Sequence, residues 1–169
     1  MTMNKNTELS AETMAFIDTI CENSNTLSER ENVKRLILEI LQHKHKLINL
    51  DLNDIRLFQG EGSITAFDVS VDASDEARMK RLVELISQKC NSDSTFCKIL
   101  IMLICPQNNM LKIGEMNELA ILFDGFNKDV QSVWGIAVDE QESTTPKLRG
   151  IILIKGLRCG SPWIAHQAC

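Results

Sequence analysis

The chain has 169 residues, 44% of them hydrophobic and 24% charged, and its formal net charge is −5. A chain of this length buries about 70% of its unfolded surface, which is enough for one compact core. The acidic balance argues against a surface for nucleic acid or acidic membrane, because such surfaces need clustered Lys and Arg. The longest apolar run, residues 99–105, is too short to span a bilayer, and the first five residues form no signal core. We therefore expect a cytoplasmic protein without a direct membrane contact.

Residues 1–45 predict an N-terminal helical segment. The apolar residues within 14–21 suggest one short helix. Ser28 and Glu31 have the spacing of a capping box, which marks a second helix start. Apolar residues then recur at helical spacing, at Val33, Leu36, Ile37, Ile40 and Leu41. This helix should end at the cluster of His and Lys in residues 43–46, whose positive charge would face the negative end of the helix.

Residues 46–157 predict a domain of alternating strands and helices. Phe67, Val69 and Val71 alternate with polar residues, as in a strand with one buried face. The continuous apolar run 99–104 is typical of a central strand that is covered on both faces. Two further strands are expected at 133–138 and 151–154.

Two helices are expected between these strands. The first covers 75–89 with Ser74 as its N-cap, and the second covers 115–124 with Gly125 just past its end. The order of elements predicts an α/β (α+β) fold, a four-stranded mixed sheet with packed helices. Residues 158–169 would be a short tail, in which Trp163 either packs on the core or anchors a partner.

A polar array follows the second predicted helix. Asn49, Asp51 and Asp54 form an N-x-D-x-x-D pattern. Two carboxylates three residues apart, beside a carboxamide, can orient a water or help to hold a hydrated cation next to a phosphate supplied by another molecule. The pattern also fits a purely structural interpretation, because Asn and Asp commonly satisfy backbone groups where a loop turns.

The sequence offers no other strong site. No G-x-x-x-x-G-K-[ST] or G-x-G-x-x-G loop is present, so the chain should not bind GTP by itself. His43 and His45 have no obvious third partner for a metal site, and the six cysteines contain no C-x-x-C pair. We therefore expect no metal and no cofactor of the chain's own, and no enzyme activity by the chain alone.

Four segments in order carry a family resemblance. The ten residues 47–56, L-I-N-L-D-L-N-D-I-R, are similar to the synergy loop L-I-N-V-D-F-A-D-V-R of FtsZ, the tubulin-like cell-division GTPase. Residues 73–78 resemble its A-S-G-E-D-R, residues 115–118 its E-x-N-E, and residues 134–140 its W-G-x-x-V-D-E strand. The segment 47–157 therefore resembles the C-terminal domain of FtsZ, without the GTP-binding domain.

The resemblance implies a role in trans on FtsZ or a related filament protein. In that family one subunit holds GTP and the synergy loop of its neighbour completes the hydrolytic site. By resemblance, Asn49, Asp51 and Asp54 would be the catalytic residues, acting on GTP and a cation held by the partner. Leu50 and Leu52 would supply contact with that partner. The chain would then modulate filament growth or GTP hydrolysis.

The chain also departs from the family. Lys46 stands where the family has a glycine before the synergy loop, and residues 67–71 replace a glycine-rich strand. Two other interpretations therefore stay open. The chain could be a small-molecule sensor or an enzyme on the same scaffold, with its site in a cleft beside the sheet. It could also be a stable but inactive remnant.

Overall fold

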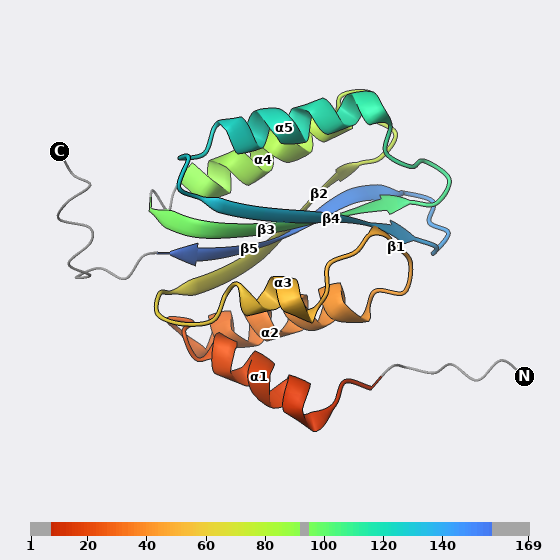
Figure 1. Cartoon of the computed structure of the whole chain (residues 1–169). Helices are drawn as coiled ribbons and strands as arrows, with labels where there is room; N and C mark the ends of the chain where they lie inside the picture. Colours follow the sequence, from red (N-terminus) through yellow and green to blue (C-terminus); the bar gives the residue numbers. More distant parts are fainter. Residues whose placement is uncertain (1–7, 92–94, 157–169) are drawn as a thin grey trace, which may run out of the picture.

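The computed structural model describes residues 8–91 and 95–156, which form a central sheet with helices on both faces (Figure 1). Five strands lie in the order β1-β4-β3-β5-β2. β3 runs parallel to β4 and antiparallel to β5, so the sheet is mixed. The strand bounds are β1 (Lys46–Ile48), β2 (Ile64–Asp72), β3 (Phe96–Pro106), β4 (Gln131–Asp139) and β5 (Lys147–Gly156).

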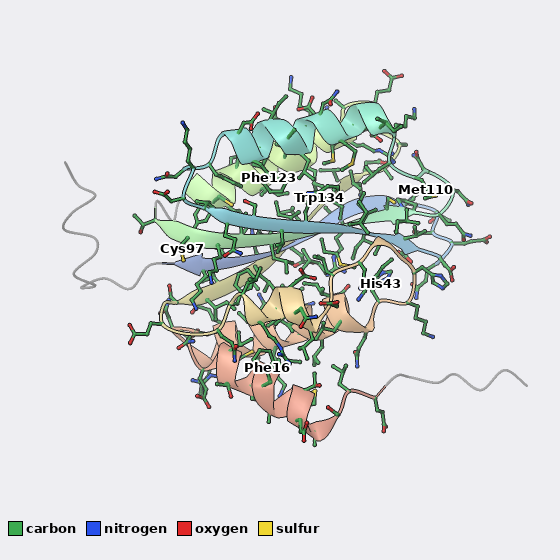
Figure 2. All side chains as sticks on the ribbon, viewed as in Figure 1. Phe16, His43, Cys97, Met110, Phe123 and Trp134 are labelled. Atoms are coloured by element: carbon green, nitrogen blue, oxygen red, sulfur yellow. The ribbon has the colours of Figure 1, made fainter. Side chains whose placement is uncertain are left out.

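β3 is the central strand, as its continuous apolar run predicts. Its residues alternate between two apolar clusters because successive side chains of a strand point to opposite faces. Leu100 and Met102 belong to the cluster under α1 (Ala11–Cys21) and α2 (Leu27–Gln42). Ile99 and Ile101 belong to the cluster under α4 (Arg78–Asn91) and α5 (Met116–Asp124). Side chains fill the space between sheet and helices on both faces (Figure 2). The prediction of a strand covered on both sides is confirmed.

The first helical layer contains α1 (Ala11–Cys21), α2 (Leu27–Gln42) and the short α3 (Leu52–Arg56). The α2 stripe of Val33, Leu36, Ile37 and Ile40 is buried, as its spacing predicts. The predicted capping box was wrong. Thr26 and Glu29 form the box instead, because two overlapping boxes are present and the earlier one adds a further half turn of helix.

The second helical layer contains α4 (Arg78–Asn91) and α5 (Met116–Asp124), the latter preceded by the 3₁₀ turn η1 (Ile113–Glu115). The predicted helix at 115–124 is confirmed, and Gly125 follows its end. The predicted start of the other helix at 75 was wrong. Ser74 is not an N-cap, since its N–H and hydroxyl both donate to Asp72 Oδ1. Asp75 accepts from Ala77 N, so the chain makes a turn before α4 begins.

The prediction of four strands missed β1. This strand has only three residues, pairs antiparallel with β4, and contains an irregularity in its register. It shows no alternating pattern, because Leu47 and Ile48 are both exposed. Gly135 of β4 permits its close approach: a Cβ there would lie 2.7 Å from the Ile48 carbonyl oxygen.

Residues of the predicted N-terminal segment and of the predicted domain share one apolar cluster. Ile17 of α1 and Leu36 of α2 join Leu153 of β5 in it. The predicted tail 158–169, with Trp163, lies outside the described residues.

Candidate functional site

The polar array lies on the loop that joins β1 to α3. Asn49 and Asp51 are exposed, and Asp54 is half-buried in the first turn of α3. This loop leaves the edge of the sheet and leads to α3, which lies on the same face of the sheet as α2 (Figure 1). The structure therefore places all three predicted site residues within one short surface segment.

The two carboxylates of the array are oriented by backbone hydrogen bonds. Asp51 is the N-cap of α3 and its Oδ1 accepts from Asn53 N at 2.8 Å. Asp54 Oδ2 accepts from Asp51 N at 2.8 Å, which completes a capping box. The structural interpretation is thus confirmed for Asp51 and Asp54. It does not exclude a second use, because an ionised carboxylate offers about four lone-pair sites.

Lys46 links this loop to the end of α2. Its Nζ donates to Leu41 O at 3.3 Å and to Leu50 O at 2.9 Å. Burial lowers the pKa of the Lys46 ammonium, while the nearby carboxylates of Asp51 and Asp54 act in the opposite direction. One cation of β1 thus lies near the two carboxylates of the array, and its ammonium is bound to backbone oxygens.

At the end of α2, a carbonyl of the last helical turn accepts a hydrogen bond from Lys46. His43 is the C-cap of α2, and burial lowers its pKa below the usual value, so it is neutral at pH 7. His45 Nε2 lies 2.9 Å from Glu140 Oε2. The contact of a positive charge with this end of the helix is thus seen for Lys46, one of the four residues of the predicted cluster.

Of the two leucines predicted to contact a partner, Leu50 is buried, and more exposed apolar residues lie just before the array in β1. Leu50 is only 2% exposed, because its side chain packs against Gly135 and joins the core, and Leu52 is half-buried. Leu47 and Ile48 are 58% and 39% exposed. Gly135 leaves room for Leu50 beside β4, a contact that no local sequence pattern indicates.

A polar groove of about 550 Å³ lies beside the sheet, at the carboxyl ends of β3 and β4. Asp139, Lys147 and Arg149 line it, together with Glu39 and His43 from α2. Figure 2 shows His43 at the end of α2, near the loop that leads to β1. Its Nδ1 is buried and has no hydrogen-bond partner among the described residues. None of the residues of the polar array lines this groove.

Within residues 8–91 and 95–156, no three His, Cys, Asp or Glu side chains gather in a way that could hold a metal ion. In the same part of the chain, no helix has the length and apolar character needed to cross a membrane.

The sequence matches no protein-family model and no curated protein. Solved structures do match. An FtsZ dimer from M. jannaschii aligns with 76% of this chain at 20% identity and a TM-score of 0.57. A GDP-form protofilament of TubZ from Bacillus thuringiensis serovar israelensis aligns with 81% at 14% identity and a TM-score of 0.56. A GTPγS-form protofilament of the same protein aligns with 91% at 13% identity and a TM-score of 0.56.

The chain has the fold of the FtsZ/tubulin C-terminal domain. The fold expected from the resemblance is therefore confirmed, with one additional strand. The chain spans 38% of the FtsZ structure and 39% and 41% of the two TubZ structures. At these identities the likeness concerns the fold, so the roles of Asn49, Asp51 and Asp54 remain predictions.

Proposed function

We propose that this chain binds FtsZ or a related filament protein in trans through the loop Asn49–Asp54, and thereby modulates polymerisation or GTP hydrolysis. The observation that supports this most directly is the exposed array itself. Asn49 and Asp51 are exposed next to a half-buried Asp54, and backbone hydrogen bonds hold both carboxylates in one orientation. Preorientation of this kind lowers the cost of ordering a water or cation at the moment of binding.

Each residue of the array has a proposed role. Asp51 and Asp54 would position the attacking water and support a hydrated cation, and Asn49 would touch the nucleotide or brace the loop. The partner would hold both GTP and the cation. Carboxylates repel a triphosphate, and these 169 residues contain no glycine-rich phosphate loop. Calorimetry of GTP with the chain alone should therefore show no binding, and a low-micromolar complex would contradict the proposal.

Ground-state contact with the partner is assigned to Leu47 and Ile48. Both are large, apolar and exposed, and they directly precede the array. This assignment replaces Leu50, whose side chain belongs to the core. Replacing Leu47 by Ser should weaken association with the filament without unfolding the chain, since an exposed side chain adds little to stability.

The proposal is tested by titrating the chain into polymerising FtsZ from the same cell, following pelleting and light scattering. Substoichiometric chain should shorten filaments, because it fills the end that exposes nucleotide and offers no nucleotide site to the next subunit. Glu84→Gln is the matched control for substitutions of the carboxylates in the array. Glu84 is an exposed carboxylate on α4, across the sheet from α3, so its loss should not change the effect on filaments. If the chain does not co-pellet with FtsZ and the light scattering does not change, binding in trans is refuted.

A second candidate function is the binding of a small polar molecule in the groove beside the sheet. The unpartnered Nδ1 of His43 favours it, because a buried polar atom without a hydrogen bond is costly unless a ligand satisfies it. This groove is separate from the polar array. A thermal-shift screen of small charged metabolites should distinguish the two functions: His43→Gln would abolish a shift from this groove and leave filament binding intact.

A further inference from the structure

The short helix α3 is held at its C-terminal end by two lysines from the sheet. Lys98 Nζ of β3 donates to Leu57 O at 2.5 Å. Lys155 Nζ of β5 donates to Phe58 O at 3.1 Å and also to Gln59 O. These are carbonyls at and just beyond the end of α3, which have no partner within a helix of five residues. Such a short helix is not stable by itself, so external contacts decide its position.

The burial of Lys155 is unusual for its chemistry. The side chain is 3% exposed, and none of the described carboxylates forms an ion pair with it. Desolvation lowers the pKa of its ammonium, and the neighbouring charge of Lys98 lowers it further. A buried charge without a counter-charge costs stability, which an apolar side chain of similar length would avoid. Global stability therefore does not explain a lysine here.

The two lysines are connected to the array through the backbone of α3. Leu57 N donates to Asp54 O at 3.3 Å, and Phe58 N donates to Ile55 O at 3.0 Å. The side chains of Ile55 and Phe58 are buried and fix the depth of the helix. Displacement of the lysine-bound carbonyls would be transmitted over one helical turn to Asp54.

We propose that Lys98 and Lys155 are positioning residues, which hold the C-terminal end of α3 against the sheet so that the carboxylates of Asp51 and Asp54 keep their place. The functional part of this inference rests on the role proposed above for the array. The structural part concerns the chain alone and is tested without a partner.

The structural part is tested by hydrogen exchange followed by mass spectrometry on the full chain. Lys155→Met should make the amides of residues 52–59 exchange about 10- to 100-fold faster, because two hydrogen bonds from a charged donor are lost. The melting temperature should stay the same or rise. Lys98→Met should show a smaller effect at the same amides, and Lys80→Met, at an exposed position on α4, should show none. Unchanged exchange at 52–59, or faster exchange throughout the chain, would overturn the inference.

The functional part is tested with FtsZ. Lys155→Met should reduce stimulated phosphate release about tenfold or more at saturating chain, while the concentration needed for half-maximal pelleting stays unchanged. Weaker pelleting with full release at saturation would overturn the positioning role. If the parent chain itself stimulates no release, the catalytic role proposed for the array fails, and exchange at 52–59 alone decides whether the lysines position α3.

Discussion

Arg78 and Lys155 are both almost fully buried cations, with exposures of 2% and 3%, but their surroundings differ. Arg78 forms two hydrogen bonds with the carboxylate of Glu115, at 2.7 and 2.9 Å, and also donates to the carbonyls of Ala73, Asn109 and Met110. Lys155 has carbonyl acceptors and no carboxylate within the described part of the chain. The first arrangement fixes the start of α4 to the loop before α5. The second fixes the end of the short helix that carries Asp54.

This difference teaches that burial of a charge has two distinct consequences. A buried cation with a bidentate carboxylate is an anchor, and removing one partner leaves the other charge uncompensated. A buried cation that contacts only carbonyl oxygens costs stability. Its replacement should therefore leave the fold stable but change the position of the loop that it holds.

The largest effect is expected when the Arg78 pair is broken. Glu115→Gln removes the counter-charge of a buried guanidinium and should lower the free energy of unfolding by about 3–5 kcal/mol. Urea denaturation followed by circular dichroism measures this loss. Asp75→Asn is the control, because it breaks the more exposed pair with Arg81 and should cost at most about 1 kcal/mol. Equal losses of unfolding free energy for both variants would contradict a larger contribution from the buried Arg78 pair.

An intermediate effect is expected at the capping box of α3. Asp54→Ala removes the acceptor for Asp51 N and should cost about 0.5–2 kcal/mol. Asp54→Asn keeps an acceptor oxygen while it removes the charge, so its cost should be smaller. The same denaturation experiment compares the two variants. A loss as large for Asn as for Ala would show that charge, and not hydrogen bonding, holds the loop.

The smallest effect is expected from His43, a half-buried base at the end of α2. Burial lowers its pKa, so the folded state binds a proton less readily than the unfolded state. Stability is therefore lost as the pH falls from about 6.5 through the lower pKa of the folded state. Melting temperatures of the parent and of His43→Gln between pH 7.5 and 5 should show a shallower fall for the variant. If the melting temperatures of the parent and the variant fall in parallel with pH, the lowered pKa of His43 is contradicted.

The elements predicted correctly are those whose apolar pattern is long. The continuous run of β3 and the stripe of α2 identify the central strand and a core helix, because burial on both faces of a strand leaves an uninterrupted apolar run and burial on one face of a helix leaves a helical period. β1 was missed because three residues with two exposed apolar side chains have no period. The position of β1 depends on its close contact with Gly135 of β4, and local sequence patterns do not reveal such a tertiary contact.

The candidate site was predicted as a set of residues but not as a geometry. The spacing of Asn49, Asp51 and Asp54 identified the loop, and the capping box followed the preference of Asp for helix starts. The burial of Leu50 and the lysine contacts to α3 could not be predicted. These contacts join residues that are 41 to 97 positions apart in the sequence. In addition, the sequence alone predicts that a lysine near the end of an apolar strand is exposed.

The most direct test of action in trans uses an FtsZ whose own synergy-loop carboxylates have been replaced, so that only the added chain can supply them. Phosphate release is measured with the parent chain and with Asp54→Asn, at concentrations where both pellet equally. We predict release with the parent chain and a rate lower by about 10²–10⁴-fold with the variant, since a group that orients water acts mainly in the transition state. Equal rates with both chains, or none with either, would contradict a catalytic role of the Asn49–Asp54 loop.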